Sequence, residues 1–358
     1  MTNPLDDLDN DVWVQQLVQY DESLRLGQKK EVAETAAPEV QETADFLLRL
    51  QSIWPRTRRQ IGPYTLTHSL GQGTLGTTYM VEDPATGQPY VLKVLWPNLN
   101  ADAAARAQLL QESQAVDALR HADIVGLKEV REAGPVCYVV SEYCKGPSLA
   151  QWRRRTPQPL AWEVAVPTVA RLADILEVVH RLGITHGNFK PSNIFLPHNE
   201  EITSRNLHQA TLRIAEFALA RAVLQSPLSA HGGLPWPMPH YLAPEQMRHR
   251  RRPPEPASDI YALGVLAYEL LTGRCPVKGA TREEIVGETR RTAPAPLRQF
   301  RPELPAALDT LVLQCLQKNP RDRPSSARDL AQALRALLPV PIEQKPAPAW
   351  WKQWLGWM

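Results

Sequence analysis

HGNFKPSNIFL, residues 186–196, is the stretch that decides how this chain is interpreted. It places His186, Asn188, Lys190 and Asn193 close together, just ahead of an apolar run. All four side chains donate or accept hydrogen bonds, and Lys190 carries a charge. Asn188 accepts a hydrogen bond but cannot hold a proton, so it cannot act as a general base. The segments on either side must therefore show which chemistry this loop serves.

A glycine-rich segment lies in the β-rich part of the sequence that begins at Tyr64. In GQGTLG, residues 71–76, three glycines stand between two strand-like runs, where backbone N–H groups can point at phosphates: Gly71, Gly73 and Gly76. A strand-like run follows them, whereas a dinucleotide-binding fingerprint requires a helix there. Lys93 on the next strand could reach α- and β-phosphates, and Glu112 on the following helix could hold Lys93. The three features in this order are much more specific than any one alone.

The coarse architecture predicted from the sequence is α+β, with two lobes. Residues 64–95 and 126–143 are strand-like, residues 100–121 form a helix rich in Ala, Leu and Gln, and the chain after Ser148 is mostly helical. A small β-rich lobe is therefore followed by a larger helical lobe. The candidate site residues lie at the joint between them.

Taken in order, these segments resemble the Hanks-type Ser/Thr protein kinases, in their bacterial branch, over residues 64–338. Four further motifs carry the resemblance: YVVSEYCKGPSL (138–149), LAPE (242–245), SDIYALGVLAYELLTGRCP (258–276) and KNPRDRPSS (318–326). The resemblance implies a kinase-like fold with a β-rich N-lobe over residues 61–145 and a helical C-lobe over residues 146–338. Outside the resemblance, charge and helical spacing predict an acidic helical extension over residues 1–60, and composition indicates a Pro- and Trp-rich tail over residues 339–358.

The resemblance also implies roles for individual residues. Glu142 to Cys144 correspond to the adenine-binding hinge and Ser141 to its gatekeeper, while Lys190 would contact the γ-phosphate. ATP with Mg²⁺ or Mn²⁺ is the implied ligand, and Asn193 and Glu216 would hold the metal. The residues implied as structural are the anchor Asp259, the pair Arg323 and Glu245, and a buried stack of Val116, Leu127, His186 and Phe217.

The chemical positions depart from the family pattern. The HRD triplet has become His186-Gly187-Asn188, and the DFG triplet has become Glu216-Phe217-Ala218. Met238 stands where such kinases usually carry a threonine. Losing the general base alone costs roughly 10²–10⁴ in rate. These changes predict a pseudokinase that acts as a scaffold or regulator of a partner protein. The alternative is a divergent Ser/Thr kinase or other ATP-dependent transferase that uses Glu216 as an unconventional metal ligand.

Nucleotide binding is predicted from the phosphate side of the site. On the adenine side, Val91 replaces the usual alanine of the roof and Phe195 the usual leucine of the floor. Both are larger than the usual residues, and overfilling a fitted cavity costs roughly 1–3 kcal/mol. The sequence thus favours ATP binding while indicating a narrowed adenine slot.

Composition and the chain ends limit the partners. The chain has 358 residues, is 43% hydrophobic and carries a net charge of +2, which gives no bulk basic character for nucleic acid. No CxxC or metal spacing joins the four cysteines, and no run of about 18 apolar residues predicts a membrane span, so a cytoplasmic location is expected. Residues 1–45 hold 11 acidic and 3 basic residues. Two basic clusters, residues 153–155 and 248–254, are either solvated surface or a docking surface for an acidic partner.

The tail WWKQWLGWM, residues 350–358, places Trp350, Trp354 and Trp357 on one helical face. Such an aromatic group suits a membrane–water interface. Packing on the protein itself or on a partner explains the tail equally well.

Overall fold

The computed structural model describes residues 60–73, 76–95, 121–133, 136–197, 202–217, 239–248, 254–279 and 281–338, with helical residues inside the range 107–116. The acidic extension up to residue 59 and the tail after residue 338 lie outside the described residues, as does the basic cluster at residues 249–253. Among the helices that are described, none has the length and apolarity needed to cross a bilayer.

The N-lobe is built on an antiparallel sheet with strand order β1-β2-β3-β4-β6-β5. Its strands are β1 (Gln60–Ile61), β2 (Tyr64–Gly73), β3 (Gly76–Glu82), β4 (Pro89–Leu95), β5 (Leu127–Ala133) and β6 (Val136–Glu142). One face buries a compact apolar cluster that includes Tyr64, Val81, Leu92 and Val140. Alternate residues of β4 therefore point away from this cluster, and Lys93 is one of them.

Gly76 is required by the packing of β3 on β4. A Cβ atom at this position would lie 1.7 Å from the carbonyl oxygen of Val94, and the residue has φ 158°. Only glycine allows the two strands to come this close. The strands on both sides of the glycine-rich segment are thus held in a fixed register, with Gly73 opposite Gly76.

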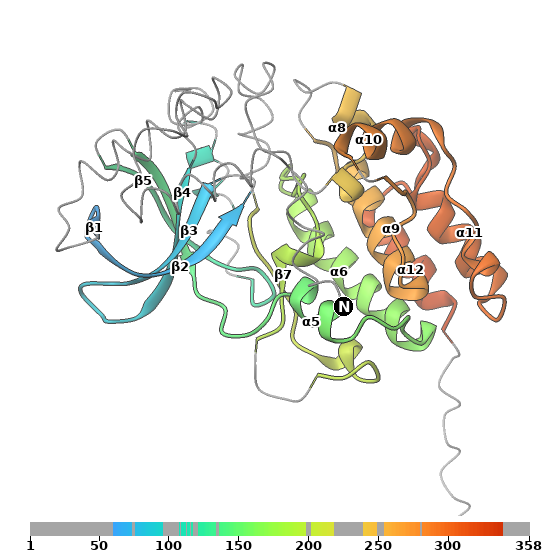
Figure 1. The fold of residues 1–358 in the computed structure, drawn as a ribbon, viewed down its shortest axis with the longest axis horizontal. Helices are drawn as coiled ribbons and strands as arrows, with labels where there is room; N and C mark the ends of the chain where they lie inside the picture. The colour runs from blue at the N-terminus through green and yellow to red at the C-terminus, as the bar shows by residue number, and fades with distance from the viewer. Residues whose placement is uncertain are drawn as a thin grey trace, which may run out of the picture.

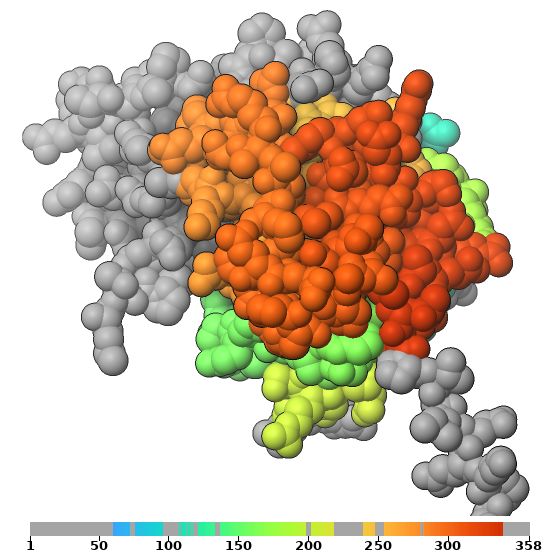
Figure 2. Space-filling model, turned by 90° about the vertical axis from the view of Figure 1, so that its right-hand side faces the viewer, coloured from blue at the N-terminus to red at the C-terminus, as the bar shows by residue number. Residues whose placement is uncertain are grey.

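The C-lobe is helical, and α9 forms its centre. Its helices are α5 (Leu149–Arg155), α6 (Trp162–His180), α8 (Pro244–Arg248), α9 (Pro256–Thr272), α10 (Arg282–Arg291), α11 (Ala306–Cys315) and α12 (Ala327–Ala336). Helix α9 is buried along nearly its whole length, as expected for a helix that is apolar on all sides. Figure 1 shows the strands on one side and α8 to α12 on the other, and the segments from α9 to α12 form most of the face seen in Figure 2. The predicted two-lobed α+β architecture is confirmed.

Short elements complete the C-lobe, and some of them position the loop at residues 186–196 and the segment before Glu216. They are η1 (Pro191–Asn193), β7 (Ile194–Phe195), η2 (Leu207–Gln209), β8 (Arg213–Ile214), η4 (Pro239–Tyr241), η5 (Leu297–Gln299) and η6 (Pro320–Asp322). Strands β7 and β8 form a two-stranded ladder that pairs Phe195 with Arg213. Ile124, in the segment before β5, bridges to Ile214 of β8 and so fastens the N-lobe to the C-lobe.

One basic cluster is smaller than the sequence predicts. Arg153 is buried, and its guanidinium donates to the carbonyl oxygens of Thr156, Pro157 and Gln158 just beyond the end of α5. All three carbonyl groups belong to residues that follow the last helical residue, Arg155. Arg153 is therefore a capping residue, and only Arg154 and Arg155 of this cluster are exposed.

Candidate functional site

Lys93 and Glu216 form an ion pair at the centre of the joint. The ammonium group of Lys93, on β4, contacts Oε1 of Glu216, which follows β8 closely in the chain. The Lys93 side chain is 11% exposed and that of Glu216 is 21% exposed. The partner expected for Lys93 was Glu112, whose side chain lies outside the described residues. In the described part of the chain, Lys93 is held from the C-lobe.

Glu216 is held as a carboxylate in an unusual backbone conformation. Its φ is 67°, and it is the one non-glycine residue with positive φ among the residues described. Burial alone would raise the pKa of Glu216, but the charges of Lys93 and Lys190 and the hydrogen bond from Lys93 outweigh burial and lower the pKa to about 2. A left-handed backbone at a non-glycine residue costs roughly 1–2 kcal/mol. The contacts of the carboxylate therefore hold Glu216 in a backbone conformation that is unfavourable in free energy.

The loop at residues 186–188 is anchored to α9 through Asp259. Asp259 accepts hydrogen bonds from the backbone N–H groups of His186 (2.9 Å) and Gly187 (2.8 Å). Its Oδ2 also lies 2.8 Å from Nε2 of His180. Asp259 itself is only 1% exposed and has these three partners. Its predicted role as an anchor is therefore confirmed.

His186 joins the loop to the segment after β8. Its ring centroid lies 4.8 Å from that of Phe217 and 5.6 Å from that of Phe189. Burial lowers the pKa of His186, so this ring is neutral at pH 7. Val116 and Leu127, the other members of the predicted stack, are also buried. The loop and the Phe217 segment thus pack as one unit.

Asn188 occupies the position of the family's base. Its Nδ2 donates to Oε2 of Glu216 over 3.5 Å, and its backbone oxygen accepts from Nδ2 of Asn193 at 3.0 Å. Lys190 is 8% exposed; burial lowers its pKa, and the charge of Glu216 opposes that shift. The structure therefore brings together five predicted residues: Lys93, Asn188, Lys190, Asn193 and Glu216.

A contact that the sequence did not indicate also holds the loop at residues 186–188, and it comes from α8. Gln246, on α8, is 6% exposed, and its Nε2 donates to the carbonyl oxygen of Gly187 at 2.8 Å. Its Oε1 accepts from the backbone of Ala243 at 3.0 Å. Gly187 has φ 68°, a conformation that glycine adopts without steric cost. The peptide of Gly187 is thus fixed by Asp259 on one side and Gln246 on the other.

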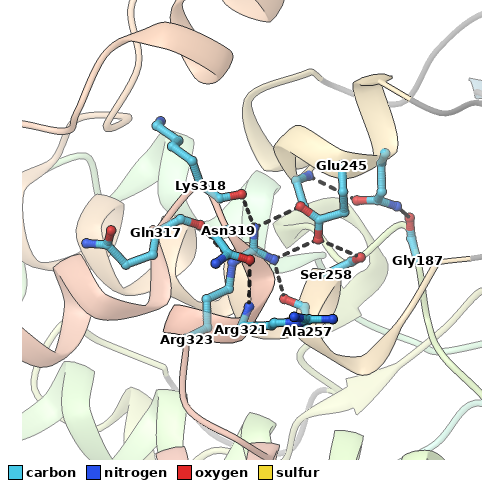
Figure 3. Close-up of polar contacts among 11 residues, drawn as sticks. Gly187, Glu245, Ala257, Ser258, Gln317, Lys318, Asn319, Arg321 and Arg323 are labelled. Atoms are coloured by element: carbon cyan, nitrogen blue, oxygen red, sulfur yellow. Dashed lines mark hydrogen bonds and ion pairs between the residues drawn. The ribbon is translucent and has the colours of Figure 1, made fainter.

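The helix that carries Gln246 is itself anchored by an ion pair. Arg323 donates from Nη1 to Oε1 and from Nη2 to Oε2 of Glu245, at 2.7 and 2.8 Å (Figure 3). The same guanidinium donates to the carbonyl oxygens of Ala257 and Gln317, and Ser258 donates to Oε1 of Glu245. The side chain of Arg323 is fully buried. The predicted pairing of Arg323 with Glu245 is confirmed.

A second unpredicted contact fastens the hinge. Arg213, on β8, donates from Nη2 to Oε2 of Glu142 at 2.5 Å and to the carbonyl oxygen of Ile124 at 2.7 Å. Its Nη1 lies 3.8 Å from Sγ of Cys144. One C-lobe side chain therefore contacts both the hinge and the N-lobe segment that contains Ile124.

We expect Arg213→Ala to lower the free energy of unfolding by about 1–2 kcal/mol, chiefly because the Ile124 carbonyl loses its donor. Glu142→Gln should cost less than about 1 kcal/mol, because half-exposed ion pairs contribute little. Urea unfolding of the two variants provides the measurement. Equal losses would show that the ion pair, and not the carbonyl contact, fastens the hinge.

Some of the remaining predicted site residues lie on described strands, and the others fall outside the described residues. Gly71, Gly73 and Gly76 lie on β2 and β3, Ser141 lies opposite Val91 in the β4–β6 ladder, and Phe195 lies on β7. Val91 and Phe195 are both partly buried, and the narrowed adenine slot stays a prediction. Ala218 and Met238 fall outside the described residues. That these residues bind a nucleotide remains a proposal.

The pattern of protein kinase domains matches residues 64–335, which is more than half of the chain. This chain belongs to the protein kinase family. The motifs of the family occur in this chain in the expected order: the glycine-rich segment, the strand with Lys93, the Asp259 anchor and the Arg323–Glu245 pair.

Bacterial kinases are among the similar proteins. Serine/threonine-protein kinase Pkn1 of Myxococcus xanthus is 31% identical over 278 residues, which cover 77% of this chain and 38% of Pkn1. PknE of Mycobacterium tuberculosis is 29% identical over 283 residues, covering 79% of this chain and 47% of PknE. The crystal structure of the Mycobacterium tuberculosis PknI kinase domain has a TM-score of 0.60 at 25% identity and covers 79% of this chain and 99% of that domain. The chain thus spans between a third and a half of these two curated relatives.

Proposed function

We propose that this protein is a catalytically impaired kinase fold that acts as a nucleotide-responsive regulator of a partner protein. The observation that carries the proposal is the side chain at the position of the base. Asn188 donates its amide toward Glu216, and an amide cannot take the proton of an acceptor hydroxyl. The sequence changes at Gly187, Ala218 and Met238 affect the same chemistry.

The parts that maintain the fold support the same proposal. Arg323, Glu245 and Asp259 keep their full sets of contacts, while the substitutions concentrate at positions of chemistry. Retained structural contacts together with replaced catalytic residues support a function that depends on the surface of the folded protein and not on phosphate transfer. An acidic partner is one candidate for that surface, and the Trp-rich tail, which lies outside the described residues, is a candidate contact with a membrane surface.

A divergent transferase is the second candidate function. It is favoured by the convergence of Lys93, Lys190, Asn193 and Glu216, because phosphoryl transfer depends mostly on positioning and charge stabilisation. Labelled ATP separates the two candidates. We expect no label on the protein or on a generic acceptor with Mg²⁺ or Mn²⁺, whereas labelling would favour the transferase.

Nucleotide responsiveness gives a separate expectation. ATP should raise the apparent melting temperature of the protein, because a ligand that binds only the folded state stabilises it by RT ln(1 + [L]/Kd). Lys93→Ala should weaken this shift, since Lys93 is the cation expected at the phosphates. Arg154→Ala, which removes an exposed charge on α5, is the control. No shift at millimolar ATP would leave a fold that binds proteins only.

A further inference from the structure

The short ladder of β7 and β8 links the predicted floor of the adenine slot to the hinge. Phe195 of β7 pairs with Arg213 of β8, and Phe195 also bridges to Ser148, just beyond the hinge. The backbone N–H of Leu196 donates to the carbonyl oxygen of Pro147 at 3.0 Å. The floor residue is therefore fastened through the backbone to the segment after the hinge, and its ladder partner is Arg213.

Arg213 extends from this ladder to both ends of the hinge. Its guanidinium contacts Oε2 of Glu142 at 2.5 Å and Sγ of Cys144 at 3.8 Å, and these are the first and last residues of the predicted hinge. Strand β6 ends at Glu142, so the hinge continues without ladder bonds to hold it. An arginine presents its N–H donors in a planar fork, so one side chain can hold two groups at a set separation. Arg213 is therefore a direct link between the hinge and the strand that pairs with the floor.

The hinge carboxylate is also located by Gly126. The backbone N–H of Glu142 donates to the carbonyl oxygen of Gly126 at 3.0 Å. A Cβ atom at residue 126 would lie 2.9 Å from Oε1 of Glu142, so glycine leaves the room that the carboxylate occupies. Arg213 donates to the carbonyl oxygen of Ile124 in the same segment. The position of Glu142 thus depends on both Gly126 and Arg213.

We propose that Arg213 is a positioning residue for the nucleotide base: by holding the hinge against the β7–β8 ladder, it makes the site favour adenine over a smaller base. This role rests on the nucleotide binding proposed above. Arg213 acts through the hinge, which the resemblance assigns to adenine, and not through the phosphates that Lys93 is expected to meet. A hydrogen bond weakens once its donor and acceptor move beyond about 3.2 Å, so a displaced hinge loses base contacts while phosphate contacts persist.

Calorimetric titration of the full chain with ATP and with UTP, in one Mg²⁺-containing buffer, tests this role. Both ligands carry the same ribose triphosphate, so the ratio of their dissociation constants reports recognition of the base. Wild-type protein should bind ATP about tenfold or more tightly than UTP, as expected for base hydrogen bonds that UTP does not form. Arg213→Ala should weaken ATP binding by about three- to tenfold, the effect of one hydrogen bond, and should change UTP binding by less than about twofold.

Arg171 provides the matched control, because it also joins the two lobes. From α6 it donates to Oδ1 of Asp123 at 2.9 Å and to the carbonyl oxygen of Ala210 at 2.6 Å. Its side chain is 31% exposed, against 22% for Arg213. None of its contacts within the described residues reaches the hinge. Arg171→Ala should therefore leave the ratio of the ATP and UTP dissociation constants unchanged.

Gly126→Ala tests the same role while Arg213 is kept. The backbone of Gly126 is not in the positive-φ region, so alanine fits there without backbone strain. Its Cβ atom must displace the Glu142 carboxylate, which ends a flexible side chain. We expect weaker ATP binding with UTP binding unchanged, a selective loss that misfolding would not give because misfolding weakens both ligands. If Arg213→Ala does not fold, this variant decides.

Equal weakening of ATP and UTP binding in these variants would overturn the proposal and leave Arg213 with a structural role only. A wild-type protein that does not distinguish ATP from UTP would also overturn it. Both results leave the nucleotide-responsive regulator in place. Binding of neither nucleotide by the wild type would overturn the proposal together with the nucleotide part of the proposed function. Phosphate transfer is a separate readout and contradicts only the catalytic impairment.

Discussion

Replacing Arg323 by alanine is expected to lower the free energy of unfolding by about 3 kcal/mol or more. The guanidinium is fully buried and donates to both oxygens of Glu245 and to the backbone of Ala257 and Gln317. Its removal takes this donor from two carbonyl groups and leaves the Glu245 carboxylate with Ser258 but without its charged partner, and unsatisfied buried groups cost free energy. Chemical denaturation at neutral pH measures the loss.

Arg335→Ala is the matched control, because Arg335 also forms an ion pair but at the surface. Its side chain and that of its partner Asp174 are each nearly half exposed. Such pairs contribute about 0–1 kcal/mol. Similar losses in the two variants would mean that Arg323 does not hold the α8 region in place.

The second large effect concerns repair of the chemistry. Asn188→Asp alone is expected to stay near background in transfer from ATP, although it supplies a carboxylate for the acceptor hydroxyl. Combined with Glu216→Asp, Ala218→Gly and Met238→Thr, it should give more activity than the single repairs sum to, because residues that act as a unit in catalysis are strongly non-additive. Single-turnover transfer at matched concentrations of folded protein makes the comparison.

Substantial activity from Asn188→Asp by itself would place the protein one step from an active kinase. The structure explains why one step should not suffice. Glu216 is committed to Lys93 and Asn188, so a new carboxylate at residue 188 would face Glu216 across a contact that is now a hydrogen bond. Like charges at this distance repel, and the pair would need a cation between them.

Residues within sequence motifs were predictable. The Asp259 anchor and the pairing of Arg323 with Glu245 follow from segments that specify both the residue and its place along the chain. The two-lobed α+β architecture followed from the change from strand-like to helical periodicity after Ser148. The architecture depends on local periodicity, which a single sequence displays directly, whereas the anchor and the pairing were implied by the resemblance to the kinase family.

Two contacts between distant side chains were not predictable, because no motif of the resemblance includes them. Gln246 and Gly187 are 59 positions apart, and Arg213 and Glu142 are 71 apart. Nothing in their own segments marks these residues. The contact of Gln246 with Gly187 depends on how segments of the C-lobe pack together, and that of Arg213 with Glu142 depends on how the two lobes meet. For Arg153 the sequence pattern was misleading, because three adjacent arginines indicate a solvated surface. In the structure, the segment after α5 supplies carbonyl groups that bind Arg153 in a buried position.

The proposal that the fold is kept while the chemistry is lost is tested most directly by single-turnover phosphate transfer. Wild-type protein in excess over labelled ATP, with Mg²⁺ or Mn²⁺ and a generic acceptor, is compared with Lys93→Ala. We predict rates that do not differ, because the wild-type site lacks a base and Lys93 then has no transfer to assist. Wild-type transfer more than about tenfold faster than that of Lys93→Ala, a difference of about 1.4 kcal/mol in the barrier, would contradict the account and identify a working kinase.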